Sequence, residues 1–172
     1  LVVATREQLL GATGNTSAIP VPALIDTCEF LEGDITIVDT VRKFKPDICF
    51  NICESHFGDA REAQVPAILD LYQVPYTFSD PMVLSLTLHK AMTKRVVRDL
   101  GIATPDFWVV EKESDIRLID PSFPLFAKPV AEGTGKGITA ASKITNRNQL
   151  AEACCEMLAH YRQPVLVETF LP

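Results

Sequence analysis

Glycines and lysines with the spacing of an anion-binding loop gather in one short stretch of the sequence. These residues are Lys128, Gly133, Gly135, Lys136 and Gly137. Only 8 glycines occur among the 172 residues, so three of them within five positions indicate a local demand of the backbone. Glycine lets backbone N–H groups approach a ligand closely, and N–H groups flanked by ammonium groups attract anions. The stretch therefore predicts a site for a polyphosphate, such as that of a nucleotide.

A glycine-rich loop between two strands is also typical of a plain hairpin turn. The Gly-Lys-Gly sequence lacks the Ser or Thr that follows the lysine of a P-loop, and the chain has no Gly-x-Gly-x-x-Gly dinucleotide fingerprint. The loop by itself therefore leaves both interpretations open.

The composition is that of an ordinary α/β protein, with 47% hydrophobic and 22% charged residues. The net charge of −6 and the lack of a basic run argue against a nucleic-acid partner. No apolar segment approaches 18 residues and no signal peptide is recognisable, so we expect a cytoplasmic protein without membrane contact. The chain begins at Leu1 and ends directly after an apolar strand, and we therefore expect a fragment.

Five cysteines are present, an odd number without zinc-ribbon spacing. They are Cys28, Cys49, Cys53, Cys154 and Cys155. Because they lie in apolar runs, we interpret them as buried free thiols rather than as a metal or redox site.

The first half of the chain alternates strands and helices, which predicts a parallel sheet. Strands are expected at residues 1–4, 34–39, 47–53 and 74–77, and the nearly continuous apolar run at 47–53 is typical of burial on both faces. A helix is expected over residues 64–72, with its apolar face formed by Ala67, Ile68, Leu71 and Tyr72. Much of residues 1–33 shows no clear pattern.

The second half predicts a smaller α+β layer. One helix should begin at Asp80 and run to Leu100, with Leu88, Met92 and Val96 on one face. Strands are expected at 107–110, 125–128, 138–144 and 164–168, and the second and third should pair antiparallel. A helix capped at Asn146 should have one apolar face, formed by Leu150, Ala153, Cys154, Met157, Leu158 and Tyr161. We therefore predict two domains, at residues 1–79 and 80–172.

Four stretches resemble the ATP-grasp superfamily, and within it the D-alanine–D-alanine ligase-like group. They are residues 74–80 (VPYTFSD), 89–94 with 101–105 (HKAMTK and GIATP), 126–137 (FAKPVAEGTGKG) and 165–171 (VLVETFL). The corresponding family motifs read IPYTGS, DK…TK…GIPTP, VKP…EGS…G and VLVEEF(L/I). Their order and spacing are specific, and together they span roughly residues 47–172. The resemblance implies an open parallel-sheet pre-ATP-grasp domain at 1–79 and the first ATP-grasp subdomain at 80–172.

The resemblance also implies roles in binding ATP. Lys90 looks like the lysine that reaches a phosphate, Lys128 like the strand lysine near the α-phosphate, and Glu168 like the acidic residue beside the adenine. The backbone of Thr169 and Leu171 would read the adenine edge. The loop that closes over the β- and γ-phosphates would comprise Glu132, Gly133, Thr134, Gly135 and Lys136. Two lysines neutralise ATP only in part, so Mg²⁺ is expected, with its ligands beyond residue 172.

Taken without the family, some of these residues have simpler interpretations. Lys90 belongs to a basic helix face, and such faces are usually solvated. Glu168 alternates with apolar neighbours, as an ordinary charge on an edge strand does. Lys128 is harder to explain as free surface because it ends an apolar strand beside a proline.

The sequence departs from the family in several places, and two of the departures concern the glycine loop and the substrate side. The glycine loop lacks the Ser-Ser pair of most ligases of the group. In residues 54–64, Gly58 and Gln64 match the family motif, but Glu54 stands where a substrate-side histidine is expected, and His56 is two residues away. Glu54 and His56 are therefore substrate-side candidates, and D-alanine is not specified as the first substrate.

The activity implied by the resemblance is carboxylate–amine ligation through an acyl phosphate, with ATP and small amino-acid or carboxylate substrates, in a homodimer. No Ser-His-Asp or Cys-His arrangement indicates covalent catalysis, and we assign no catalytic residue within residues 1–172. We expect this segment alone to bind part of the nucleotide without turnover. Two alternatives stay open: a nucleotide-binding module without ligase activity, and an unrelated doubly wound domain whose glycine loop is only a turn.

Overall fold

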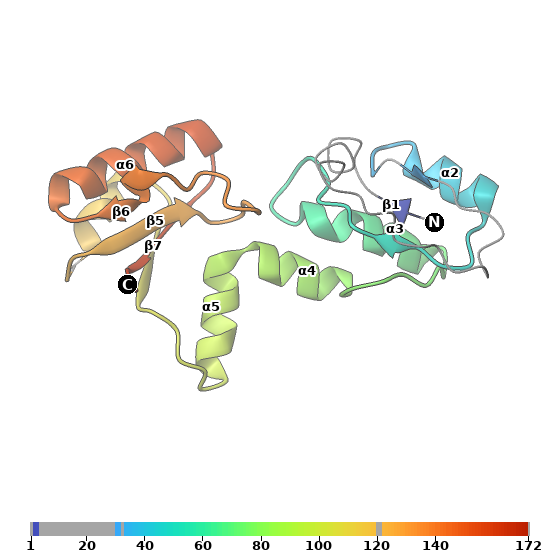
Figure 1. Cartoon of the computed structure of the whole chain (residues 1–172), viewed down its shortest axis with the longest axis horizontal. Coiled ribbons are helices and arrows are strands. Elements are labelled where there is room, and N and C mark those ends of the chain that lie inside the picture. Colours follow the sequence, from blue (N-terminus) through green and yellow to red (C-terminus); the bar gives the residue numbers. More distant parts are fainter. Residues whose placement is uncertain (1, 4–29, 32, 120–121, 172) are drawn as a thin grey trace, which may run out of the picture. The chain divides into compact units, whose positions relative to one another are not determined.

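The computed structural model describes residues 2–3, 30–31, 33–119 and 122–171, and the chain divides into two compact units, Leu1–Ser85 and Leu86–Pro172 (Figure 1). The predicted domain limit at 79/80 lies close to this division. Each unit is considered by itself below. None of the helices in the described part of the chain has the length and apolar character needed to cross a bilayer.

The first unit contains a parallel sheet, as predicted. Its strands are β1 (Val2–Val3), β2 (Phe30–Leu31) and β3 (Phe50–Asn51), in the order β2-β1-β3. Both neighbours pair in parallel with β1. The predicted strand at 74–77 is reduced to a single parallel bridge between Cys49 and Tyr76.

The strand expected at residues 34–39 is wrong, because this segment begins a helix. Helix α2 (Ile37–Phe44) buries Ile37 and Val41, four residues apart. The Asp34 carboxylate accepts hydrogen bonds from the backbone N–H and the hydroxyl of Thr36, at 2.8 and 2.6 Å, and so closes a turn before the helix. The short alternation of apolar residues is thus also the start of a helical period.

Two further expectations for the first unit need correction. Ile48 and Phe50 are 56% and 45% exposed, whereas Cys49 and Cys53 are buried, so this segment is covered on one face rather than on both. Helix α3 (Gln64–Leu71), which follows the 3₁₀ turn η2 (Arg61–Ala63), buries Val65, Pro66 and Leu69. The predicted face is right only in part, because Ile68 and Tyr72 pack against the same core whereas Ala67 and Leu71 are exposed. Both corrections have the same cause, because the hydrophobic cluster that these two segments form with α2 determines which side of each segment is covered.

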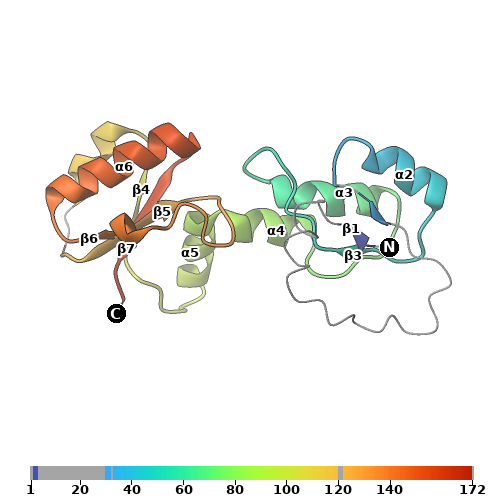
Figure 2. The same cartoon turned by 45° about the horizontal axis from the view of Figure 1, so that its top comes forward.

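The second unit is built on an antiparallel sheet in the order β4-β7-β5-β6 (Figure 2). The strands are β4 (Phe107–Val110), β5 (Leu125–Pro129), β6 (Lys143–Ile144) and β7 (Val165–Thr169). The antiparallel pairing of β5 with the returning strand is confirmed. That strand is shorter than predicted because the 3₁₀ turn η4 (Ala140–Ser142), capped by Thr139, occupies its first half. A second 3₁₀ turn, η3 (Glu113–Leu118), follows β4.

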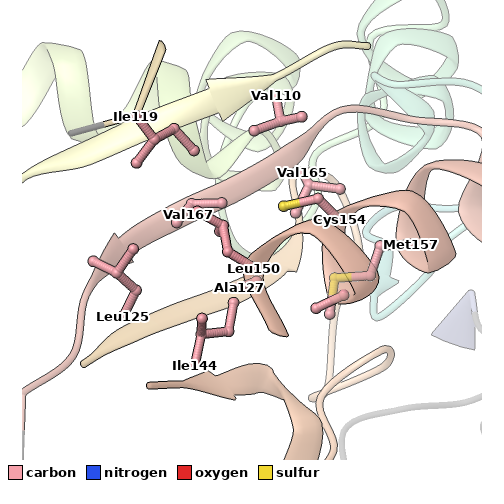
Figure 3. Packing of buried hydrophobic residues seen from close by; sticks show 11 residues of the cluster. Val110, Ile119, Leu125, Ala127, Ile144, Leu150, Cys154, Met157, Val165 and Val167 are labelled. Carbon is pink, nitrogen blue, oxygen red and sulfur yellow. The ribbon is translucent and has the colours of Figure 1, made fainter. Parts of the chain in front are cut away.

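Helix α6 (Arg147–Tyr161) covers one face of this sheet. Asn146 caps it by accepting a hydrogen bond from the N–H of Gln149 at 3.0 Å, as the sequence predicts. Figure 3 shows its predicted face, with Leu150, Cys154 and Met157, directed at the sheet. The strand residues on the other side of this core are Val110, Leu125, Ala127, Ile144, Val165 and Val167.

Helix α5 (Lys90–Asp99) covers the opposite face. Ala91 and Leu88 pack with Leu166 of β7 and with Val130. Successive residues of a strand point to opposite faces, so Val165 and Val167 face α6 while Leu166 and Glu168 face α5. By the same alternation Lys128 of β5 lies on the α5 face.

The single helix expected from Asp80 to Leu100 is in fact two. Helix α4 (Pro81–Leu88) is capped by Asp80, whose carboxylate accepts from the N–H of Val83 at 2.9 Å. The chain leaves helical geometry at His89 (φ −86°, ψ 86°), and its side chain accepts from the N–H of Met92 to cap α5. The predicted apolar stripe therefore does not continue, and Met92 and Val96 are exposed.

Candidate functional site

Lys128 and Glu168 form an ion pair across two neighbouring strands. Phe126 pairs with Glu168 and Lys128 with Leu166, so the two charged side chains are diagonal neighbours on the same face. The distance from Lys128 Nζ to Glu168 Oε1 is 2.5 Å, and the side chains are 22% and 13% exposed. The pairing of β5 with β7 therefore fixes both charges before any ligand is present.

Lys94 of α5 is the third member of this cluster and reaches Glu168 from the α5 face of the sheet. Its Nζ lies 2.9 Å from Glu168 Oε2 and donates to the Thr104 hydroxyl at 2.6 Å. Each carboxylate oxygen of Glu168 thus holds one ammonium group. Burial by itself raises the pKa of Glu168, but the hydrogen bonds from Lys128 and Lys94 outweigh it and hold the pKa below its ordinary value of 4.5.

Sequence reasoning did not select Lys94 as a site residue. In the sequence, Lys90, Lys94 and Arg98 recur every four residues and form one basic stripe of a helix. Lys94 lies in the same motif as Lys90, four residues further on, and this position is the sequence signal that could have identified it. Which of these cations turns toward Glu168 depends on how α5 lies on the sheet.

A pocket of about 250 Å³ opens beside the cluster. Its lining residues are Pro105, Phe126, Glu168, Thr169, Phe170 and Leu171. The rings of Phe126 and Phe170 are 6.3 Å apart with 35° between their planes, and Lys143 Nζ lies 4.5 Å from the Phe170 ring centroid. Two aromatic faces next to a carboxylate suit a flat heterocycle that carries an amino group.

Backbone N–H groups at the end of β7 already donate hydrogen bonds within the protein. The N–H of Thr169 donates to the carbonyl of Asp106 at 2.9 Å, and that of Phe170 to the carbonyl of Pro124 at 3.1 Å. A ligand that binds the backbone of Thr169 must therefore use its carbonyl group.

The glycine loop follows β5 directly, and its glycines have different structural reasons. Gly135 has φ +77°, and a Cβ there would meet nothing within 4 Å. Gly137 has φ +82°, and a Cβ would lie 2.6 Å from Pro129 Cγ and 3.1 Å from the Tyr161 ring. Thr134 also has positive φ, at 49°. Gly137 is required by packing, whereas the apex around Thr134 and Gly135 is exposed and shaped by backbone conformation alone.

Lys90 is directed at the root of this loop. Its Nζ donates to the carbonyl of Glu132 and, at 3.4 Å, to that of Val130. The Glu132 carboxylate lies 3.2 Å from Lys136 Nζ, and this pair joins a mostly buried carboxylate to an exposed lysine. Every residue for which the sequence predicts a role at a nucleotide therefore belongs to the second unit.

The substrate-side candidates belong to the first unit. Glu54 and His56 follow β3 and are exposed. Hydrogen bonds from Thr36 lower the pKa of Asp34, and the nearby His56 contributes a smaller electrostatic effect. Gln64 Nε2 donates to the carbonyl of Phe57 at 2.8 Å and closes the segment between them. These contacts order the loop but do not identify what it binds.

Three of the cysteines, Cys49, Cys53 and Cys154, are buried free thiols as expected, and Cys155 is partly buried. Cys28 lies outside the described residues. Burial raises the pKa of Cys154 to about 12 and that of Cys49 to about 11. Among the described residues, no group of three or more His, Cys, Asp and Glu side chains could hold a metal ion.

Sequence comparison identifies relatives that match part of this chain. No family profile matches it. A D-alanine–D-alanine ligase of Marinomonas is 34% identical over 118 residues, which cover 67% of this chain and 36% of that protein. The ligase of a Thermoanaerobacter strain is 29% identical over 164 residues, 91% of this chain and 44% of that protein. The uncharacterised protein y4sG of Sinorhizobium fredii is 31% identical over 148 residues, which cover 81% of this chain and 43% of that protein. The chain spans less than half the length of these relatives.

Solved structures show the same fold. The D-alanine–D-alanine ligase of Bacillus anthracis complexed with ATP superimposes with a TM-score of 0.72 at 17% identity, over 99% of this chain and 58% of that one. The VanG D-Ala:D-Ser ligase of Enterococcus faecalis gives 0.62 at 24% identity, over 73% of this chain and 36% of that one. The resemblance inferred from the motifs is therefore confirmed: the homologues and structural neighbours of this chain are D-alanine–D-alanine ligases of the ATP-grasp type, which it matches over part of their length.

Proposed function

We propose that the protein is an ATP-dependent carboxylate–amine ligase of the D-alanine–D-alanine ligase type. One observation carries the proposal: the cluster of Lys94, Glu168 and Lys128 stands between an aromatic pocket and a glycine loop, in a chain whose relatives are such ligases. In this proposal residues 80–172 are the first ATP-grasp subdomain and residues 1–79 are the substrate-side domain.

The adenine of ATP would enter the pocket between Phe126 and Phe170. Glu168 would accept a hydrogen bond from the exocyclic amino group. A carboxylate has about four acceptor positions, so it can do this while it keeps both lysines. The Thr169 carbonyl and the backbone of Leu171 would complete the polar edge. The two lysines would thereby serve a second purpose, because they hold Glu168 ionised and correctly oriented.

The phosphates would extend from Lys128 toward the glycine loop. Four ammonium groups line this path, and two carboxylates oppose them: Lys90, Lys94, Lys128, Lys136, Glu132 and Glu168. The side chains therefore contribute a net charge of about two, against about four negative charges on ATP. The remaining charge fits a magnesium nucleotide, in which the ion would neutralise and orient the phosphates.

The reaction proposed is formation of an acyl phosphate from a carboxylate and the γ-phosphate, followed by attack of an amine and release of phosphate. The residues of this chain would act by positioning and charge rather than by covalent catalysis. Lys128 and Lys90 would hold the nucleotide in line, and the loop at Thr134 would exclude water from the acyl phosphate. Glu54 and His56 remain candidates for the substrate side.

The substrates proposed are small amino acids or related carboxylates, in a cytoplasmic protein that dimerises. The VanG neighbour is a D-Ala:D-Ser ligase, whereas the ligases of Marinomonas, Thermoanaerobacter and Bacillus anthracis are named for D-alanine alone, so the second substrate is the variable to screen.

The first test is the shift in melting temperature produced by Mg·ATP. A ligand at about 100 times its dissociation constant stabilises a protein by roughly 2.7 kcal/mol, which a thermal scan detects readily. We expect a shift with Mg·ATP that is larger than with Mg·GTP and lost in Lys128→Met. Lys43→Met, an exposed lysine on α2, is the matched control and should keep the full shift.

Phosphate release with D-alanine and a panel of amino acids follows as the second test. Binding of ATP without any amino-acid-dependent phosphate release would favour a nucleotide-binding module. If neither nucleotide shifted the melting temperature, the glycine loop would be only a turn and the proposal would be overturned.

A further inference from the structure

Gln163 joins the segment before β7 to the beginning of the glycine loop. It stands between Arg162, which ends α6 in a left-handed conformation (φ 52°), and the first residue of β7. Its side-chain amide makes two hydrogen bonds of opposite sense. Oε1 accepts from the N–H of Ala131 at 2.6 Å, and Nε2 donates to Glu132 Oε1 at 2.8 Å.

The backbone next to Gln163 binds the same part of the loop. The carbonyl of Pro164 accepts from the N–H of Val130 at 3.0 Å. Three consecutive residues, 130 to 132, are thus tied to the two consecutive residues that directly precede β7. We name Gln163 and Pro164 the loop clamp.

The clamp lies where the loop changes from buried to exposed. Ala131 is 1% exposed, whereas Thr134 and Gly135 at the apex are exposed. The Glu132 carboxylate receives Gln163 on Oε1 and Lys136 on Oε2, and the Glu132 carbonyl receives Lys90. A displacement of Glu132 would therefore move two of the cations that line the path proposed for the phosphates.

The amide of Gln163 supplies both the acceptor and the donor that these two contacts need. Gln163→Leu keeps the approximate volume and removes donor and acceptor together. Gln163→Glu keeps an acceptor for Ala131 but places a second carboxylate against Glu132, and close like charges repel. The hydrogen bond to a charged group is the stronger of the two.

We propose that Gln163 is a positioning residue that fixes the root of the glycine loop, and through it the binding of the nucleotide phosphates. The first part concerns this chain alone, and the second rests on the function proposed above. Gln163 acts through Ala131 and Glu132 and does not itself touch the nucleotide.

Tryptic cleavage after Lys136 measures the anchoring without any nucleotide. This side chain is 66% exposed at the loop apex, and cleavage there rises with local opening. We expect Gln163→Leu to be cleaved at least about fivefold faster than the unmodified protein, because loss of a hydrogen bond to a charged group changes a local equilibrium by that much or more. Cleavage at this bond is identified by peptide mass.

Gln149→Leu is the matched control. Gln149 also makes two side-chain hydrogen bonds in the same unit, accepting from the N–H and the hydroxyl of Thr145, both at 2.9 Å. These contacts are at the opposite end of α6 from Gln163. Cleavage after Lys136 should be unchanged in this variant, and an equal acceleration in both variants would overturn the proposal as a general loss of stability.

An exchange of partners provides a rescue. Gln163→Glu should accelerate cleavage, and adding Glu132→Gln should reverse most of the acceleration, since the amide donor now comes from position 132. Equal rates in the single and double variants would show that the contact does not set the loop root.

Binding of ATP and of adenosine separates this inference from the proposed function. Gln163→Leu should weaken ATP about fivefold or more and leave adenosine affinity unchanged. If the unmodified protein binds neither ligand but the cleavage results hold, the proposed function fails and the anchoring by Gln163 stands. If ATP affinity is unchanged although cleavage accelerates, the role of Gln163 at the phosphates is overturned.

Discussion

The aromatic pocket and the glycine loop adjoin opposite ends of β5 in the second unit and are held in place by different means. The pocket lies where β5 begins and β7 ends, and these two strands are paired over their whole length and covered by a helix on each face. The loop has a short root bound by Gln163, Pro164 and Lys90, and its apex is exposed. The pocket is therefore preorganised, whereas the loop depends on a few contacts at its root.

This difference fits a division of labour in nucleotide binding. A preorganised pocket recognises the base at little entropic cost. A loop with an exposed apex can admit the phosphates and then cover them. Substitutions in the two regions should accordingly differ in kind, with stability and base affinity affected in one and phosphate binding in the other.

The largest contrast is expected between the two ion pairs. Lys94→Met leaves the mostly buried Glu168 with one cation fewer and should lower the free energy of unfolding by about 3 kcal/mol. Lys136→Met removes an exposed partner of Glu132 and should cost less than about 0.5 kcal/mol. Urea unfolding of both variants measures the difference. Similar losses would mean that the strand cluster is no better fixed than the loop.

The two loop glycines with positive φ should also differ. Gly137→Ala drives a Cβ into the rigid Pro129 ring at a positive φ and should cost about 2–3 kcal/mol. Gly135→Ala meets open space, so only the backbone conformation opposes it, at about 1 kcal/mol. Melting temperatures of the pair provide the measurement. An equal cost for both would show that the contact with Pro129 does not constrain Gly137.

Base and phosphate recognition can be separated by ligand. Phe170→Ala removes one aromatic face of the pocket and should weaken adenosine and ATP alike, by about tenfold. Lys136→Met should weaken ATP and leave adenosine unaffected. Calorimetric titration with both ligands distinguishes the two patterns. If the Phe170 variant lost affinity for ATP but kept its affinity for adenosine, the base would not bind in this pocket.

The smallest effect concerns pH. Because the pKa of Glu168 is lowered in the folded state, its ion pairs stabilise the fold at and above pH 4.5, and this contribution is lost as the pH falls below 4.5 toward the folded-state pKa. Glu168→Gln should flatten this part of the stability profile. The measurement is the free energy of unfolding at pH 7 and at successive values below pH 5. An unchanged profile in the variant would show that other carboxylates govern acid sensitivity.

The sequence predicted well where a pattern is long and local. Helix α6 was predicted from its apolar period and from Asn146, and strands β5 and β7 from their apolar runs. Prediction failed where a short pattern permits two structures. Residues 34–39 alternate like a strand but turn at Asp34 into a helix, and the break at His89 depends on one side chain that caps a new helix.

The candidates for the nucleotide side follow from the motifs, because their spacing along strands and loop is fixed locally. Lys128, Glu168 and the glycines are predicted in this way. Three facts came only from the tertiary structure: that Lys94 shares Glu168 with Lys128, that Gly137 is a packing requirement, and that Gln163 holds the loop root. Each joins segments far apart in the chain, and such contacts depend on strand register and helix docking, which no single stretch of sequence encodes.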